Sequence, residues 1–145
     1  MEANNIGIKV AKPKEKCKDN NCPFHGSLRC RGRIFTGTVI SVKMQKTASV
    51  WWERRNFLRK YERYEKRKSG VKAHNPSCIN AQEGNIVKIM ECRPLSKTKS
   101  FVIIEVSGKE RGFKERMEAE EESKVKREAK KIDEQTDEAE EEVAK

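Results

Sequence analysis

The sequence contains no long apolar run. The longest one in its sheet-forming part covers residues 101–104, far short of the roughly 20 apolar residues that a membrane-spanning helix requires. The N-terminus does not combine a basic start with an apolar stretch, so we expect no secretory signal, no membrane partner and a cytoplasmic location. Apolar residues make up 34% of the 145 residues and charged residues 39%, which predicts one modest domain without a large buried core.

Signatures of the common enzyme classes are also missing. There is no phosphate-binding Walker loop, no glycine-rich dinucleotide fingerprint and no helical metalloprotease motif. His74 and Cys78 could suggest a nucleophile pair, but no oxyanion-hole element accompanies them. His74 stands beside the turn-forming pair Asn75-Pro76, where a polar contact is the simpler interpretation. We therefore predict that the protein is not an enzyme and has no small-molecule substrate.

Cysteine occurs five times, and an odd number without a secretory signal argues against a disulfide framework. Reduced buried thiols and a metal site are the remaining alternatives. The spacing Cys17-x4-Cys22-Pro-Phe-His25 is not one of the strong paired arrangements, and small buried thiols are common in a reduced cytosol. We expect no required cofactor. The alternative is a structural zinc ion that fastens the N-terminal segment, held by Cys17, Cys22, His25 and Cys30.

Charge is distributed unevenly along the chain. The total of 33 Lys and Arg against 23 Asp and Glu gives a net charge of +10. Residues 114–145 contain 8 basic and 13 acidic residues, a net charge of −5, which leaves 25 basic and 10 acidic residues, a net charge of +15, for residues 1–113. A small domain with this excess of positive charge repels itself unless an anionic partner neutralises it, so we predict a nucleic-acid ligand.

The chain divides into three predicted parts: an irregular arm over residues 1–31, a folded domain over 32–112 and a charged extension over 113–145. The domain contains short β-rich runs separated by turn residues, at 34–42, 47–54, about 66–73, 85–92 and 100–106. Five such strands without intervening helices predict an all-β fold, a five-stranded oligonucleotide-binding (OB) barrel.

Details of the strands are less regular. Gly37 interrupts the first run and would permit a bulge or the sharp coiling of a small barrel. Residues 43–46 form a short hairpin loop, and Pro94 is expected to close the fourth strand. Residues 55–72 have no clean period and predict an irregular or long-stranded excursion.

The extension has no Gly or Pro after residue 112 and is rich in Glu, Lys and Ala, which predicts a solvated helix. Oppositely charged pairs such as Glu120/Lys124 and Glu122/Lys126 stand at helical spacing. A weak heptad stripe leaves a coiled coil or docked helix as the alternative to a single charged helix or fraying tail; it consists of Val125, Ala129, Ile132, Thr136, Ala139 and Val143.

Positive charge gathers at two places. Lys43, Lys46, Lys97 and Lys99 fall at strand ends, where side chains can reach phosphates without being buried, and Ser96, Thr98 and Ser100 add hydroxyl groups. A second basic segment is interleaved with Phe57, Tyr61 and Tyr64, which could stack on bases; for Phe57 and Tyr61, packing onto the barrel is the favoured role. The cations of this segment are Arg54, Arg55, Arg59, Lys60, Arg63, Lys66, Arg67, Lys68 and Lys72.

Several ordered motifs resemble one family, that of small-subunit ribosomal protein seventeen. The motifs are Gly37-x-Val39-x-Ser41-x-Lys43-Met44-x-Lys46-Thr47, then residues 60–67 (KYERYEKR), His74-Asn75-Pro76, Gly84-x-x-Val87 and residues 91–101 (ECRPLSKTKSF). Residues 22–26 (CPFHG) and the block at 61–67 resemble its archaeal and eukaryotic branch. Trp51 and Trp52 depart from the smaller β-branched residues of the family, and the extension has no match.

The resemblance implies an OB barrel that binds small-subunit ribosomal RNA directly, assists assembly of the ribosome and lies beside neighbouring small-subunit ribosomal proteins. The resemblance also implies that residues of the family's RNA-facing loops bind RNA, in addition to cations of the basic segment. The predicted RNA-binding residues are Lys43, Met44, Lys46, Thr47, Arg54, Arg55, Lys60, Arg63, Lys66, Arg67, Lys68, Lys72, His74, Asn75, Arg93, Ser96, Lys97, Thr98 and Lys99.

Two other functions remain open at this point. A free single-strand-binding barrel would need an exposed aromatic platform, for which the sequence offers little beyond Trp51 and Trp52. A protein-interaction adaptor would act through the charged extension. Deleting residues 114–145 separates the adaptor from the RNA binder, because only the adaptor would lose its partner.

Overall fold

The computed structural model describes residues 4–13, 15–123 and 125–126. The chain forms two units, Met1–Glu110 and Arg111–Lys145, and the first contains every strand of the described part. Within the described residues, no helix has the length and apolar character needed to cross a membrane.

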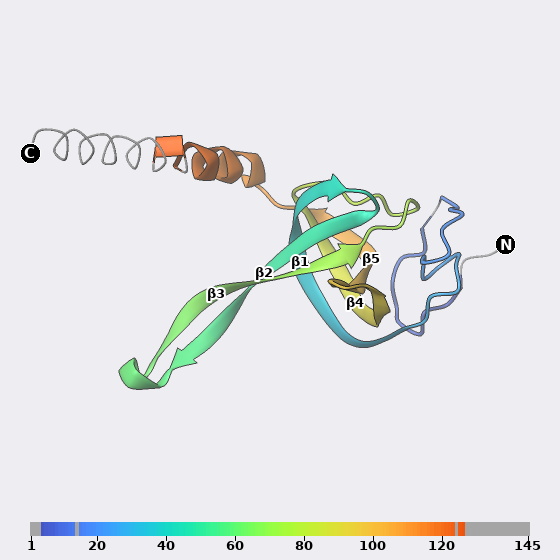
Figure 1. The fold of residues 1–145 in the computed structure, drawn as a ribbon, viewed down its shortest axis with the longest axis horizontal. Coiled ribbons are helices and arrows are strands. Elements are labelled where there is room, and N and C mark those ends of the chain that lie inside the picture. Colours follow the sequence, from blue (N-terminus) through green and yellow to red (C-terminus); the bar gives the residue numbers. More distant parts are fainter. Residues whose placement is uncertain (1–3, 14, 124, 127–145) are drawn as a thin grey trace, which may run out of the picture. The chain divides into compact units, whose positions relative to one another are not determined.

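Five strands and one short 3-10 helix make up the first unit (Figure 1). They are β1 (Cys30–Met44), β2 (Thr47–Leu58), η1 (Arg59–Tyr61), β3 (Arg63–His74), β4 (Asn85–Ser96) and β5 (Lys99–Lys109). The strands close into a ring in the order β1-β2-β3-β5-β4, in which β3 and β5 pair in parallel and all other neighbours are antiparallel. This ring is an OB-like fold, so the predicted all-β, five-stranded class is confirmed.

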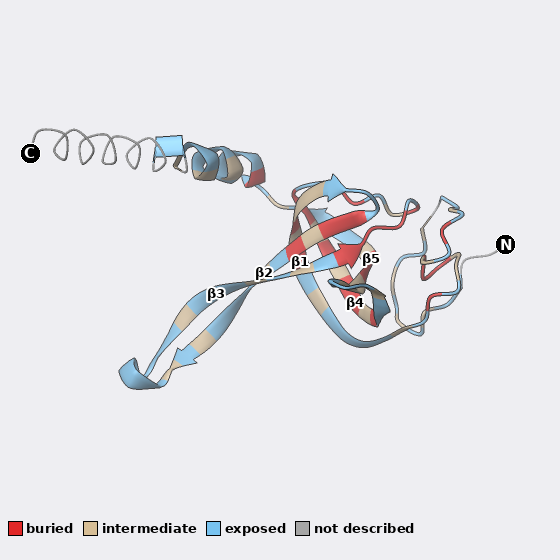
Figure 2. Ribbon diagram, viewed as in Figure 1, coloured by how far each residue is buried: buried red, intermediate tan, exposed pale blue. Residues whose placement is uncertain are grey.

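The interior of the ring is filled by small and branched side chains from all five strands. Val39, Val50, Val87 and Ile103 are fully buried there. Removing such side chains from water is the main force that holds a small barrel together. Figure 2 shows buried residues in the ring and in the N-terminal arm, while the distal part of the β2–β3 hairpin is exposed or half-buried.

A second apolar cluster joins the N-terminal arm to β4 and β5. Met90, Val102 and Ile104 are buried beneath Ile6 and Ile8 of the arm. Alternating residues of a strand point to opposite faces, so β5 supplies Ile103 to the ring interior and its neighbours Val102 and Ile104 to this second cluster. The arm is irregular, but it packs on the domain.

The strands are longer than the sequence indicated. Pro94, expected to end the fourth strand, lies within β4, because the β4–β5 register shifts between Glu91 and Ser96 and the missing amide hydrogen is tolerated there. Gly37 permits a close approach: a Cβ at this position would lie 2.5 Å from the backbone oxygen of Trp51. The bulges between β1 and β2 fall later, between Val39 and Met44.

Residues 55–72, for which the sequence offered an irregular or long-stranded excursion, form the distal part of a regular antiparallel hairpin. The β2–β3 register runs without a shift from Thr47 opposite His74 to Leu58 opposite Arg63. Figure 1 shows this hairpin projecting well beyond the ring. Both faces of the projecting part meet solvent, so the sequence lacks the alternation of apolar and polar residues that normally marks a strand.

The two tryptophans, Trp51 and Trp52, lie on opposite faces of β2. Trp52 stacks on Phe35 with ring centroids 4.8 Å apart and packs against the core. Trp51 lies over Gly70 on the other face, where a Cβ would come within 2.6 Å of the indole ring. Gly70 therefore makes room for the large ring at position 51.

In the second unit, residues 113–123 and 125–126 are helical, which agrees with the predicted helix for that stretch. Glu122 and Lys126 form an ion pair at 3.8 Å, and Val125 is 64% exposed. The other members of the predicted heptad stripe, and Lys124, lie outside the described residues.

Candidate nucleic-acid interface and the thiol–imidazole cluster

One rim of the barrel brings together the β1–β2 turn, the end of β3 and the β4–β5 turn. Thr47 lies opposite His74 in the register, and Lys72 lies opposite Lys99. The Lys99 Nζ atom donates to the Thr47 hydroxyl at 3.1 Å, and this hydroxyl donates to the Gln45 carbonyl at 3.0 Å. We call this region the basic rim. Its exposed predicted residues are Lys43, Met44, Lys46, Lys72, Arg93, Ser96, Lys97 and Thr98, with Lys99 half-buried.

Three residues predicted to face RNA are buried in this structure. The Asn75 side chain donates to the Ala81 carbonyl and accepts from the Ala81 amide, both at 3.0 Å, so it holds the β3–β4 connection. His74 is 2% exposed, and Thr47 is engaged by Gln45 and Lys99. The structure thus places these side chains beneath the rim, as its supports.

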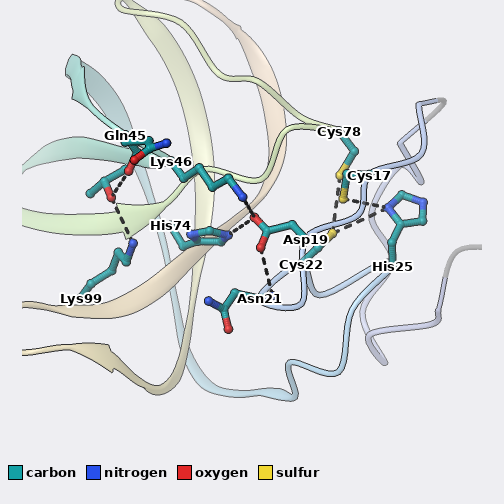
Figure 3. Close-up of polar contacts among 11 residues, drawn as sticks. Cys17, Asp19, Asn21, Cys22, His25, Gln45, Lys46, His74, Cys78 and Lys99 are labelled. Atoms are coloured by element: carbon teal, nitrogen blue, oxygen red, sulfur yellow. Dashed lines mark hydrogen bonds and ion pairs between the residues drawn. The ribbon is translucent and has the colours of Figure 1, made fainter.

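Asp19 of the N-terminal arm contacts two residues of this region, His74 and Lys46. Its carboxylate accepts from the His74 Nε2 atom at 3.0 Å, from the Asn21 amide at 3.2 Å, and lies 3.7 Å from the Lys46 Nζ atom (Figure 3). Burial raises the pKa of the Asp19 carboxyl, but the Asn21 amide, His74 and Lys46 together bring it below its ordinary value. Asp19 was not among the predicted site residues, because a single acidic residue in an irregular arm has no periodic signal.

The environment of His74 favours the neutral form of its ring. Burial is the main cause that lowers its pKa, and the nearby cations Lys99 and Lys46 add to the effect, while Asp19 opposes it. Its Nδ1 atom is buried and has no hydrogen-bond partner among the described residues. A proton on Nδ1 would therefore be a buried donor without an acceptor, which favours the tautomer that carries its hydrogen on Nε2.

The distal hairpin has two distinct faces. Residues directly opposite in an antiparallel pair share a face, and successive residues alternate between faces. One face, the Trp51 face, carries three cations and three aromatic rings; its residues are Trp51, Glu53, Arg55, Phe57, Tyr64, Lys66 and Lys68. Within the described residues, the side chains of Arg55 and Lys66 have neither a hydrogen bond nor an ion pair, while the Lys68 Nζ atom lies 5.7 Å from the Trp51 ring centroid.

On the opposite face, the Arg54 face, several polar side chains form hydrogen bonds and an ion pair with one another. The Arg54 guanidinium donates to the Ser69 hydroxyl at 2.8 Å, and Asn56 donates to the Glu65 carboxylate at 2.9 Å. Arg67 forms an ion pair with the same carboxylate. Apart from Arg63 beside the tip, the polar side chains of this face thus have partners within the hairpin, so the Trp51 face offers more free hydrogen-bond donors for a ligand.

The aromatic residues of the hairpin are exposed. Phe57 contacts Tyr64 across the hairpin, with ring centroids 5.1 Å apart and the ring planes tilted by 53°, and their exposed fractions are 48% and 70%. Tyr61 in η1 is 62% exposed. The expectation that Phe57 and Tyr61 pack the segment onto the barrel is therefore wrong, because the hairpin carries both rings away from it. Lys60 and Arg63 are exposed on either side of the tip.

The predicted RNA-binding residues thus form two surfaces at opposite ends of the β2–β3 pair. At about 3.4 Å per residue, the eleven steps from Thr47 to Leu58 place the hairpin tip on the order of 35 Å from the basic rim. The arrangement can bind two separate regions of an extended polyanion.

A separate group of side chains lies where the arm meets the β3–β4 connection. Four potential ligand atoms there lie within 4.8 Å of one another, and we call them the thiol–imidazole cluster: Cys17, Cys22, His25 and Cys78 (Figure 3). The predicted fourth member, Cys30, is not part of it. Cys30 lies in β1 opposite Cys92, and burial raises its pKa to about 12. Cys78 was missed because its partners are more than fifty residues away in the sequence.

Backbone amides approach the sulfur atoms of this cluster. Burial raises the pKa of the Cys17 thiol, but hydrogen bonds from the Asp19 amide and from Cys22 and Cys78 bring the pKa below its ordinary value. Burial keeps the pKa of Cys22 above its ordinary value although the amides of His25 and Phe24 lie near its sulfur. The loop that places these amides needs Gly26, where a Cβ would overlap with the backbone oxygens of Asp19 and Asn20.

The central part of the chain is similar to a known family. Residues 37–105, from the middle of β1 into β5, match the family model described as ribosomal protein S17. Small ribosomal subunit protein uS17 of Methanopyrus kandleri is 59% identical over 104 residues, which cover 72% of this chain and 88% of that protein. The chain belongs to the ribosomal protein S17 family. The family assigned by resemblance is confirmed.

Other relatives in the S17 family agree. The uS17 protein of Methanocaldococcus jannaschii is 52% identical over 109 residues, covering 75% of this chain and 93% of that protein. The uS17 protein of Methanococcus vannielii is 56% identical over 101 residues, covering 70% and 93%. These relatives are archaeal, which agrees with the resemblance of residues 22–26 to the archaeal and eukaryotic branch of the family. Members of this family are structural ribosomal proteins, a kind of protein that is not an enzyme.

Proposed function

We propose that this chain is a structural constituent of the small ribosomal subunit that binds small-subunit ribosomal RNA directly and assists its folding and assembly. The contacts come from the basic rim and from the distal hairpin. The protein would act in the cytoplasm, on the ribosome, beside neighbouring small-subunit ribosomal proteins. Binding needs no cofactor and no small-molecule substrate, because cations and hydroxyl groups of the protein make the contacts.

The exposure of the cations carries this proposal. Predicted RNA-binding cations such as Lys43, Arg55, Lys66 and Lys97 are exposed, and their charged groups have no hydrogen bond or ion pair within the described part of the chain. Such side chains remain hydrated in the free protein and can release counterions when they meet phosphates. A rigid ring and a regular hairpin fix their spacing, so they would favour folded RNA of matching shape.

Residues within the rim have different roles in this proposal. We assign phosphate contacts to the exposed cations Lys43, Lys46, Lys97 and Arg93, and stacking on unpaired bases to the aromatic rings of the Trp51 face. The three buried residues below the rim hold the turns in place: Thr47, His74 and Asn75.

The first experiment is sucrose-gradient fractionation of a cell lysate at low and moderate salt, with the chain followed by mass spectrometry. We expect it to sediment with small subunits after the salt wash. If the chain stays at the top of the gradient, the ribosomal role is wrong and a free single-strand-binding role should be tested next.

Direct RNA binding is tested with the purified chain and small-subunit ribosomal RNA fragments. The logarithm of the affinity should fall linearly with the logarithm of the salt concentration, with a slope of about 0.7–0.9 per neutralised phosphate. Replacing Lys43 and Lys97 together with glutamine should lower this slope by about 1–2. The matched control removes two cations outside the proposed surfaces, Lys109 and Arg111, and should change the slope less. Equal effects of the two double variants would contradict a specific basic rim.

A further inference from the structure

The thiol–imidazole cluster has no role in the proposed RNA contacts. It joins three residues of the N-terminal arm to Cys78, which lies between β3 and β4. Figure 3 shows the three sulfur atoms and the His25 ring gathered around a common centre. We propose that this cluster binds one structural zinc ion, which fastens the arm to the barrel.

The distances between its atoms fit a zinc tetrahedron. Zn–S bonds of about 2.3 Å and a Zn–N bond of about 2.0 Å give tetrahedral edges of about 3.8 Å between sulfurs and about 3.5 Å between sulfur and nitrogen. The Cys22 and Cys78 sulfurs are 3.6 Å apart. The His25 Nδ1 atom lies 3.5 Å from the Cys17 sulfur and 3.7 Å from the Cys22 sulfur. These three separations already match the edges that shared coordination would impose, and all four ligand atoms lie within 4.8 Å of one another.

The type of ligand selects the metal and its role. Three thiolates and one imidazole are the soft and borderline donors that favour Zn²⁺ over Mg²⁺ or Ca²⁺. All four positions would be filled by protein, and Cys22 is fully buried while Cys78 is 9% exposed. A closed site of this kind leaves no coordination position for water or substrate, so its role is structural.

The surrounding backbone supports thiolates at these positions. Amides of Asp19, Phe24 and His25 approach the sulfurs of Cys17 and Cys22, and such N–H groups partly compensate negative charge on sulfur. Apolar packing covers the cluster, since Phe24 is buried beside it and Ile79 packs against it. Zinc binding would release the thiol protons to solvent, and the ion would offset the mutual repulsion of three neighbouring thiolates.

The zinc content of the intact chain is the first test. The full chain, expressed with zinc supplied and purified under reducing conditions, should contain about one zinc ion per molecule. Replacing zinc with Co²⁺ should produce the sulfur-to-metal charge-transfer bands and the strong visible bands of a tetrahedral thiolate site. A chain that binds neither metal above background would overturn the proposal, as would a Cys22–Cys78 disulfide in the freshly purified protein.

Alkylation of the native protein identifies the ligands without any mutation. A chelator should increase the rate of modification of the three cluster cysteines at least tenfold relative to the two other thiols. The three are Cys17, Cys22 and Cys78, and the internal controls are Cys30 and Cys92. A chelator effect on Cys30 in place of Cys78 would assign a different ligand set and overturn the proposed one.

Variants then test Cys78 separately. Cys78→Ser should weaken zinc binding by more than about 100-fold, because it removes a direct ligand. Cys92→Ser is the matched control, because Cys92 is 8% exposed but lies outside the cluster, and it should leave the zinc content unchanged. Cys78→His, which offers a different zinc ligand, should restore part of the binding and so separates coordination from folding. Retention of full zinc affinity by Cys78→Ser would disprove the role of Cys78.

Discussion

At the scale of single residues, Asp19 connects three segments of the chain through one buried carboxylate. It contacts its own loop at Asn21, the end of β3 at His74 and the β1–β2 turn at Lys46. The β1–β2 turn carries part of the proposed RNA surface. Asp19 therefore helps to position that surface through its contacts with His74 and Lys46.

Replacing Asp19 with alanine should lower the free energy of unfolding by about 1–3 kcal/mol, because it leaves the buried His74 Nε2 atom without its partner. Urea denaturation followed by tryptophan fluorescence measures the change. Glu91→Ala is the control, since Glu91 pairs with the exposed Arg33 at the surface and should have little effect. A smaller loss for Asp19→Ala than for Glu91→Ala would contradict the assigned role.

His74 gives a pH dependence with a definite sign. Because burial lowers its pKa below 6.5 in the folded state, the unfolded state takes up its proton first as the pH falls. Stability that depends on neutral His74 is therefore present above pH 6.5 and is lost as the pH falls below it. His74→Gln, which can still donate to Asp19, should reduce this loss between about pH 7 and pH 5 in urea titrations. Identical pH profiles would exclude His74 as the cause.

The residues that sequence analysis located correctly and those that it missed differ physically. Cations such as Lys43 and Lys97 could be placed at the surface because charge resists burial wherever the chain folds. His74 and Asn75 belong to the same family motifs, yet they are buried, because polar side chains can be satisfied inside by Asp19 and Ala81. A linear sequence does not show such partners before the fold brings them together.

At the scale of elements, the distal hairpin is the least protected part of the first unit. Two strands without a covering layer are only marginally stable by themselves in water. The β2–β3 pair is nevertheless continuous with the ring, and two cross-strand contacts of the Arg54 face, Arg54 to Ser69 and Asn56 to Glu65, connect its two strands. The hairpin can therefore present the Trp51 face in a fixed orientation.

Removing two cations from one face of the hairpin should affect RNA affinity differently from removing two cations from the other face. Arg55→Gln with Lys66→Gln removes two cations that have no hydrogen bond or ion pair in the described part of the chain, so it should lower affinity for the RNA fragment about tenfold or more. Arg54→Gln with Arg67→Gln removes cations already engaged by Ser69 and Glu65 and should have a smaller effect. Filter binding at constant salt measures both. A larger loss from the Arg54 face would reverse the assignment.

The elements could be predicted only where one face is buried. The strand at residues 47–54 was visible because Ala48 and Val50 alternate with exposed or half-buried residues. Beyond Arg54, charge on both faces removed the pattern while the hydrogen-bonded ladder continued. The parallel pairing of β3 with β5 had no local signal, since the ring is completed by contacts between distant strands.

At the scale of the whole molecule, charge divides between a basic body and an acidic end. Residues 114–145 contain 13 acidic and 8 basic residues. Deleting them should leave affinity for the RNA fragment unchanged or higher, because the deleted part has a net negative charge. Titration of the full and shortened chains against the same fragment tests this. A loss of RNA affinity of more than about tenfold would show that the extension takes part in RNA binding. Loss of a protein partner on deletion would instead favour the adaptor role.

The β3–β5 pairing closes the ring over only a few residues, and we call it the seam. This parallel pairing runs only from Lys72 to His74 and from Lys99 to Val102, with a register shift, whereas the β2–β3 ladder extends over the whole of both strands. Two side-chain contacts lie at this seam, from Lys99 to Thr47 and from Asp19 to His74. Amide hydrogens of the seam should therefore exchange with solvent through local opening, well before the rest of the barrel. Because Asp19 of the arm contacts His74 there, the exchange rates of these amides also report on docking of the arm: undocking should increase them.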